Sequence, residues 1–251
     1  MLTKDTAICL RTTDYSETSQ IVTLFTRATG KIAAIAKGAK RPKSAFDGPI
    51  EILSLGQIVF SDSSRDKLAT LTEFQQKSVF TCKADNLFAL NCCLFAAELL
   101  NNLTHDYDPH PELFDSFLQF LQHTNEIRDA SDERRDLLSL LILFQLTLLR
   151  EIGLMPVLNA CVNCRTSHKS RVTGDKIYFS SSANGLVCKD CEPSFPDRIG
   201  LSKNAADCLN NTRLIAQAKE STLIEIEKGL VHHFTEILHK PPKMAKHILK
   251  N

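Results

Sequence analysis

The stretch "SQIVTLFTRATGKIAAIAK", residues 19–37, shows a clear strand pattern in the N-terminal part of this chain. It contains two short runs, 19–26 and 30–37, that are rich in Ile, Val and Thr, and these residues favour β-strands. Gly30 stands between the two runs, where it permits a tight turn. The stretch therefore predicts two adjacent strands joined by a turn.

Three further runs of the same kind surround this stretch. They cover residues 6–12, 50–60 and 67–74, and the polar segment 61–66 separates the last two. Five short strands in about eighty residues, with a turn signal roughly every ten, fit a small barrel such as the OB-fold. An SH3-like barrel would show the same periodicity.

The hydrophobic period changes to that of helices after the strands. Residues 137–149 are apolar on nearly all sides, which indicates a helix at the centre of a bundle. Ser221 is predicted as the N-cap of the last long helix, and Pro241 and Pro242 end it. The sequence thus predicts an α+β protein with helices over residues 85–103, 111–122, 132–153 and 221–238.

The charge is unevenly distributed along a nearly neutral chain. The formal net charge is +1, but residues 1–75 carry +2, residues 76–155 carry −6 and residues 156–251 carry +5. Basic ends around an acidic middle suggest segregated surfaces and a polyanionic partner for the ends.

The compartment affects how the cysteines are interpreted. The first residues contain no long apolar segment after a basic start, and the most apolar window is too short to span a bilayer. We therefore expect a cytosolic protein without a membrane partner. Because disulfides are rare in that compartment, paired cysteines are first considered as metal ligands.

Two C-x-x-C pairs, separated by 23 residues, predict a metal site. Two residues between cysteines let both thiolates of a pair reach one tetrahedral ion, so we expect one structural Zn²⁺ in a zinc ribbon with short strands in 171–187. Four reduced thiols without metal are the alternative. The other five cysteines lie in apolar contexts and are predicted to be buried. The predicted ligands are Cys161, Cys164, Cys188 and Cys191.

A cluster of cations follows the second of the two opening strands, in "AKGAKRPKSAF", residues 36–46. Cations in a loop beside a barrel neutralise phosphates and release counterions without reading base sequence. We call the cations of this segment (Lys37, Lys40, Arg41 and Lys43) the basic loop. Arg11, Arg27 and Lys31 extend the predicted DNA-binding track if their side chains point outward; a solvated loop without function is the alternative.

Residues 14–51 resemble the RecO family of bacterial recombination mediators. The similarity lies in "SET" (16–18), "FT" (25–26), "GK" (30–31) and the segment 36–44. Further along, it rests on the general layout and on the cysteine quartet. The resemblance implies an OB-like nucleic-acid-binding barrel in 1–80, a helical domain in 81–157, an inserted zinc ribbon in 158–195, and C-terminal helices in 196–251 that complete the helical domain.

The resemblance also implies a non-catalytic function. RecO proteins bind single- and double-stranded DNA, anneal strands coated by single-strand-binding protein, and act with RecR to help load RecA. They bind the acidic C-terminal tail of the single-strand-binding protein, for which the cations of the helical region are candidates. The candidate cations of the helical region are Arg128, Arg134, Arg135 and Arg150. A cytoplasmic, nucleoid-associated location follows from the role in recombination.

Two other functions are compatible with a basic loop and a cysteine quartet. One is a zinc-dependent nucleic-acid-processing enzyme, but a four-thiolate shell has no open coordination position and no H-x-E motif precedes the cysteine pairs. The basic loop also lacks the G-x-x-x-x-G-K pattern of a P-loop. The other is a protein-interaction scaffold whose basic loop binds an acidic protein.

Overall fold

The computed structural model describes residues 2–42, 44–46, 48–61, 68–80, 86–127, 133–166 and 176–249. The chain divides into two compact units, Met1–Glu126 and Ile127–Asn251. We call them the N-terminal unit and the C-terminal unit and describe each by itself.

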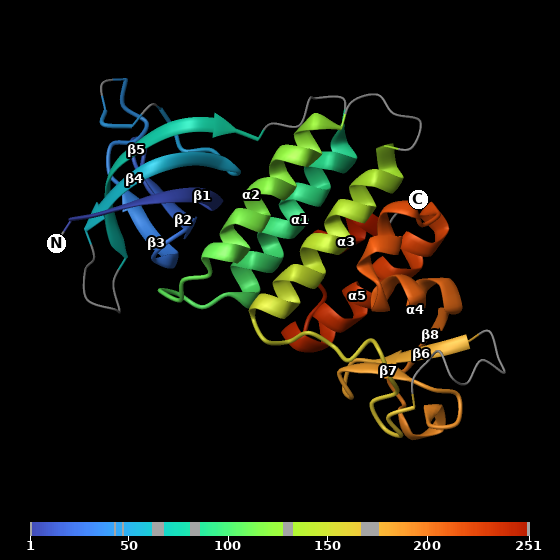
Figure 1. The fold of residues 1–251 in the computed structure, drawn as a ribbon. Coiled ribbons are helices and arrows are strands. Elements are labelled where there is room, and N and C mark those ends of the chain that lie inside the picture. Colours follow the sequence, from blue (N-terminus) through green and yellow to red (C-terminus); the bar gives the residue numbers. More distant parts are fainter. Residues whose placement is uncertain are drawn as a thin grey trace. The chain divides into compact units, whose positions relative to one another are not determined.

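Five strands of the N-terminal unit form a closed barrel in the order β1-β2-β3-β5-β4 (Figure 1). Strands β3 and β5 pair in parallel, whereas the other neighbours are antiparallel. This confirms the predicted α+β class with a five-stranded OB-like barrel. The strands are β1 (Leu2–Asp14), β2 (Gln20–Thr26), β3 (Gly30–Ala36), β4 (Ser54–Ser61) and β5 (Ala69–Val79).

Alternating side chains on the strands fill the barrel. In β3, Ile32, Ala34 and Ala36 are fully buried, and the residues between them face outward and are half-buried. The ladder between β1 and β2 shifts register between Cys9 and Arg11. A bulge of this kind changes the direction of the following side chain, and Arg11 is exposed whereas the residues before it are buried.

Two helices, α1 (Leu87–Leu103) and α2 (Pro111–Glu126), complete the N-terminal unit. The ring of Phe25 on β2 lies 5.9 Å from the ring of Phe114 on α2. At Gly30, φ is +86°, and an added Cβ would overlap the backbone of Asp108 in the α1–α2 connection. Glycine therefore permits both the turn between β2 and β3 and the close approach of this connection.

The C-terminal unit combines helices with a three-stranded antiparallel sheet in the order β7-β6-β8. The long helix α3 (Glu133–Glu151) packs against α5 (Glu220–Leu238), and both bury an apolar face. None of the helices in the described residues is long and apolar enough to cross a membrane. The remaining elements are β6 (Lys176–Ser180), β7 (Gly185–Val187), η1 (Glu192–Ser194), β8 (Ile199–Ser202), α4 (Lys203–Asn210), η2 (Thr212–Gln217) and α6 (Ala245–Leu249).

The four predicted helices are present, and each begins within two residues of its expected start. The predicted N-cap of the helix over residues 221–238 is wrong. Helix α5 begins at Glu220 with Lys219 as N-cap, and the backbone carbonyl of Lys219 accepts hydrogen bonds from Thr222 and Leu223. Ser221 thus lies inside the first turn. No bounds for helices α4 and α6 or for strand β8 were predicted from the sequence, because each has at most eight residues and little periodicity shows over that length.

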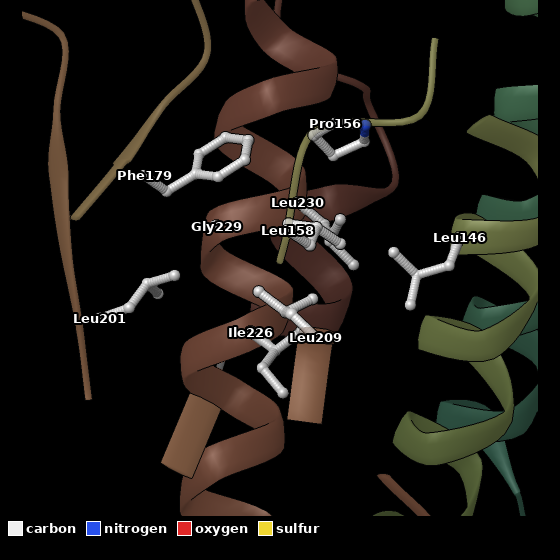
Figure 2. A pocket seen from close by; sticks show the side chains of 9 residues that line it. All are labelled: Leu146, Pro156, Leu158, Phe179, Leu201, Leu209, Ile226, Gly229 and Leu230. Atoms are coloured by element: carbon white, nitrogen blue, oxygen red, sulfur yellow. The ribbon is translucent and has the colours of Figure 1, made fainter. Parts of the chain in front are cut away.

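A small apolar pocket lies in the C-terminal unit. Figure 2 shows side chains from α3, α5, the sheet and the 156–158 segment converging on it. Its lining contains no charged residue: Leu146, Pro156, Leu158, Phe179, Leu201, Leu209, Ile226, Gly229 and Leu230.

Candidate metal centre and nucleic-acid interface

Each C-x-x-C pair of the C-terminal unit forms a tight turn. The backbone N–H of Arg165 donates to the carbonyl of Cys161 at 2.9 Å, and that of Glu192 donates to the carbonyl of Cys188 at 3.0 Å. Arg165 has a φ of +59°, which closes the first turn in the left-handed region. The second turn continues into η1. Each turn directs its two sulfurs to the same side.

The two turns bring the four sulfurs of the quartet within 4.8 Å of one another. Cys164 Sγ and Cys188 Sγ are 3.7 Å apart. Sulfurs bound tetrahedrally to zinc at about 2.3 Å are separated by about 3.8 Å, so the group has the dimensions of a four-thiolate site. Backbone and amide N–H groups also point at the sulfurs: Cys188 N lies 3.4 Å from Cys161 Sγ, and Asn163 Nδ2 lies 3.3 Å from Cys191 Sγ.

The protein environment affects the thiols of the quartet differently. Hydrogen bonds from Thr166 lower the pKa of Cys164 to about 6, whereas burial raises the pKa of Cys188 to about 12. Thiolates are the metal-binding form, so a bound cation would displace the proton from the half-buried thiol of Cys188. With all four positions taken by sulfur, a tetrahedral ion would have no site for water or substrate.

The basic loop of the N-terminal unit is anchored to the turn between β1 and β2. Gly38 N donates to Ser19 Oγ at 3.1 Å, and Lys40 N donates to the carbonyl of Thr18 at 3.1 Å. Gly38 has a φ of +74°, and the side chain of Ala39 is fully buried in the barrel core. The "SET" segment therefore supports the basic loop, a relationship that the sequence did not reveal.

The outer face of β2 and β3 lies between Arg11 and the basic loop. Arg11 is opposite Thr23 on β2, and Thr23 is opposite Ala33 on β3, so the three form one row across the sheet. The next row contains Ile21 and Ile35, and all four residues of β2 and β3 in these rows are half-buried. Lys37 follows Ile35 by two residues and is exposed. In OB-folds, this face and the adjoining loops bind oligonucleotides.

The seven predicted DNA-binding cations differ in their exposure and in their ion-pair partners. Arg11, Lys37 and Arg41 are exposed, and no described residue forms an ion pair with them. Lys40 is paired with Asp14 at 2.6 Å. Lys43 lies outside the described residues.

The other two predicted cations bind helices of their own unit. The guanidinium of Arg27 donates two hydrogen bonds of 2.8 Å to the carboxylate of Asp115 on α2. Lys31 Nζ donates to the carbonyls of Asn101 and Thr104, at 2.8 and 2.6 Å, where α1 ends. A phosphate would have to displace these contacts, so Lys31 in particular is poorly placed to bind DNA.

Of the cations predicted for the acidic tail, Arg128 lies outside the described residues, and the other three have acidic neighbours. Arg134 pairs with Glu220, Arg135 with Asp136 and Arg150 with Glu151. An open groove elsewhere in the C-terminal unit was not predicted. It combines apolar residues with the exposed Arg213, and its lining is Met155, Pro156, Val157, Leu158, Asn159, Leu209, Asn210, Asn211, Thr212 and Arg213. Only the fold unites these two short segments, about fifty residues apart.

Two family models together match most of this chain. The model described as Recombination protein O N terminal matches residues 1–80, and the one described as Recombination protein O C terminal matches residues 84–245. The chain belongs to the RecO family. The basic loop lies in the first RecO region and the cysteine quartet in the second.

Full-length RecO relatives support the same assignment. The DNA repair protein RecO of Rhodopirellula baltica is 35% identical over 218 residues, which cover 86% of this chain and 77% of that protein. The DNA repair protein RecO of Bacillus pumilus is 31% identical over 243 residues, with 94% and 89% covered. That of Bacillus subtilis is 33% identical over 209 residues, with 83% and 76% covered.

Proposed function

We propose that this RecO family protein is a non-catalytic recombination mediator in DNA repair. It binds single- and double-stranded DNA, anneals complementary strands coated by single-strand-binding protein, and assists RecA loading at gaps together with RecR. The observation that carries the proposal is the anchored basic loop beside the outer face of β2 and β3. This role belongs in the bacterial cytoplasm, at the nucleoid.

The charges and the side chains of this face suit the binding of DNA without preference for base sequence. Arg11, Lys37 and Arg41 offer positive charge to phosphates, and the release of counterions supplies affinity that is independent of sequence. The half-buried strip between them offers small and aliphatic side chains rather than base-specific donors and acceptors. A mediator that acts at any gap requires such indifference to sequence.

We assign the cysteine quartet one structural Zn²⁺ ion. The spacing of the sulfurs and the all-sulfur donor set support this choice, since zinc accepts four cysteines in tetrahedral geometry. The ion would hold the two cysteine turns together and add folding free energy to the C-terminal unit. A zinc-dependent nucleic-acid-processing enzyme needs an open coordination position, which four thiolates do not leave.

For the acidic tail of the single-strand-binding protein, we propose the open groove that contains Arg213. A peptide that carries both carboxylates and apolar side chains needs a cation next to an apolar surface. Val157, which is 44% exposed, offers the apolar surface, and Arg213 has no ion-pair partner among the described residues.

Annealing of complementary oligonucleotides coated with single-strand-binding protein tests the proposed function, with zinc content measured on the same sample. We expect faster annealing without any nucleotide cofactor, and one zinc per chain. A gel shift with a polyanion competitor separates DNA binding from a scaffold that binds an acidic protein. Absence of both annealing and DNA binding would rule out the mediator function.

A further inference from the structure

A buried carboxyl group and a buried amide meet where α3 packs against α5. Glu227 on α5 and Gln145 on α3 are both 0% exposed, and Gln145 Nε2 donates a hydrogen bond of 2.9 Å to Glu227 Oε1. The remaining oxygens, Glu227 Oε2 and Gln145 Oε1, are buried as well, and no donor of the described residues reaches either of them. Two neighbouring buried acceptors without donors are unfavourable.

The two unpaired oxygens become complementary once the carboxyl group carries a proton. A protonated Glu227 has an O–H donor on Oε2, and Gln145 Oε1 is an acceptor on the same amide that already donates to Glu227. One hydrogen bond in each direction then closes a ring between acid and amide. We infer that Glu227 is protonated and forms a two-bond acid–amide pair with Gln145, which joins α3 to α5 and is lost when the proton leaves.

The surroundings of the pair favour the neutral acid. Helix α3 has no ionisable side chain between residues 137 and 149, and Leu146 and Ile226, the chain neighbours of Gln145 and Glu227, line the apolar pocket (Figure 2). Burial raises the pKa of Glu227 from 4.5 to about 7, opposed only by the hydrogen bond from Gln145, and no charged group contributes. The pKa of the buried His233, farther along α5, is lowered to about 4, so it adds no positive charge near neutral pH.

Apart from the buried Cys208, the other ionisable groups of the packed elements form hydrogen bonds or ion pairs, or are half-buried or exposed. On α5, Glu225 accepts hydrogen bonds from the backbone and hydroxyl of Ser202, His232 contacts the carbonyl of Asp197, and Lys228 is exposed. Strand β8 has no ionisable side chain. The groups on the remaining neighbours are Lys203, Asp207 and Cys208 on α4, Arg213 on η2, Lys246 and His247 on α6, and Glu133, Arg134, Arg135, Asp136, Arg150 and Glu151 at the ends of α3.

The protonated pair makes the stability of the protein depend on pH in a defined window. A carboxyl group whose pKa is raised by folding stabilises the folded state fully below its unfolded pKa, and this contribution falls until the pH reaches the folded pKa. For Glu227 the window runs from 4.5 to about 7. Within it, the folding equilibrium constant falls by up to about tenfold per pH unit, and above it the contribution stays constant.

The substitution Glu227→Gln tests this dependence, because a second amide keeps both hydrogen bonds and has no titratable proton. Urea unfolding of the zinc-loaded protein is measured from about pH 5.5 to about pH 8. We expect the ratio of folding constants, wild type to E227Q, to fall about tenfold per unit up to neutral pH and then level off. Glu236→Gln, an exposed change on the same helix, serves as the control. For this variant we expect the ratio of folding constants, wild type to E236Q, to stay the same across the pH range.

Infrared spectroscopy tests the protonation directly and does not depend on stability. We expect a protonated-carboxyl band in the wild type near pH 6 that is absent from E227Q and disappears from the wild type in alkali. If E227Q does not fold, Gln145→Met serves instead, since it keeps the acid and shifts the band by removing its amide partner. No such band near pH 6, together with a ratio that does not change with pH, would show an ionised Glu227 and overturn the inference.

Discussion

At the scale of single residues, contacts within the protein distinguish cations that look equivalent in the sequence. Arg11, Lys37 and Arg41 project from the barrel without ion-pair partners among the described residues. Lys31, on the same barrel, is held by the end of α1. Replacing Arg11, Lys37 or Arg41 should therefore lower the affinity for a polyanion more than replacing Lys31.

Reversing two exposed charges should weaken DNA binding. For Lys37→Glu combined with Arg41→Glu, we expect lower affinity for single-stranded DNA and a salt dependence whose slope is reduced by about 0.7 for each lost phosphate contact. Fluorescence anisotropy at several salt concentrations measures both. Lys228→Glu, an exposed change in the C-terminal unit, is the matched control. Equal affinities of variant and wild type would contradict the proposed interface.

Removing one sulfur of the quartet should release the metal. We expect Cys188→Ser to lower the zinc content from one ion per chain to a small fraction, and to destabilise the folded protein, because three thiolates no longer complete the shell. Metal analysis and thermal unfolding measure the two effects. Cys208→Ala is the control, since Cys208 is buried outside the quartet. Full zinc content in C188S would exclude this residue as a ligand.

At the scale of elements, the helix pair α1–α2 is joined to the barrel by polar and apolar contacts. Arg27 pairs with Asp115, Lys31 binds the end of α1, and Phe25 contacts Phe114. Arg27 and Asp115 are each about half exposed, and exposed ion pairs contribute about 0–1 kcal/mol. We therefore expect a substitution at Gly30, where the α1–α2 connection approaches closely, to destabilise the N-terminal unit more than the loss of the ion pair.

Two glycines with positive φ allow this approach to be measured. In Gly30→Ala the new methyl group would overlap the backbone of Asp108, whereas in Gly153→Ala it would meet nothing within 4 Å. We expect Gly153→Ala to cost about 1 kcal/mol of backbone strain and Gly30→Ala clearly more. Urea unfolding measures both costs, and equal values would indicate that the connection moves away without penalty.

The open groove of the C-terminal unit is likewise defined by elements, the 155–159 segment and the end of α4 with η2. For Arg213→Glu we expect at least about tenfold weaker binding of a peptide from the acidic tail of the single-strand-binding protein, because a charge pair becomes a repulsion. Calorimetry with the peptide measures this. Lys228→Glu, an exposed change on α5, is the control. The same affinity for R213E and wild type would exclude this groove.

At the scale of the whole molecule, the candidate DNA interface and the candidate metal centre belong to different compact units. The barrel core does not include any residue of the cysteine quartet. A metal that supports only its own unit should therefore affect folding far more than DNA binding.

Removing zinc from the complete protein tests this separation. We expect a strong chelator to lower the thermal stability of the C-terminal unit, while the affinity for single-stranded DNA changes less than about twofold, because phosphate contacts come from the basic loop. Calorimetry and anisotropy on the same sample measure the two effects. Parallel loss of both would show that the metal supports DNA binding.

The five strands, the four long helices and the two cysteine pairs could be predicted from the amino-acid sequence alone. Each follows from a short-range pattern: alternation in the strand 30–36, apolar periodicity in the helix 111–126, and the two-residue spacing within a pair. Such patterns depend on residues only a few positions apart, so a single sequence contains them in full.

Which cations are available to a ligand, and which polar groups contact each other, became clear from the folded structure and not from the sequence. Lys31 is occupied because α1 ends beside β3, and the basic loop is held because Thr18 and Ser19 lie next to it. Gln145 and Glu227 are separated by 82 positions in the chain, yet they share one hydrogen bond in the interior. The physical reason is that burial and pairing depend on distances in space. The fold sets these distances between residues that are far apart in the sequence, so a local sequence pattern does not contain them.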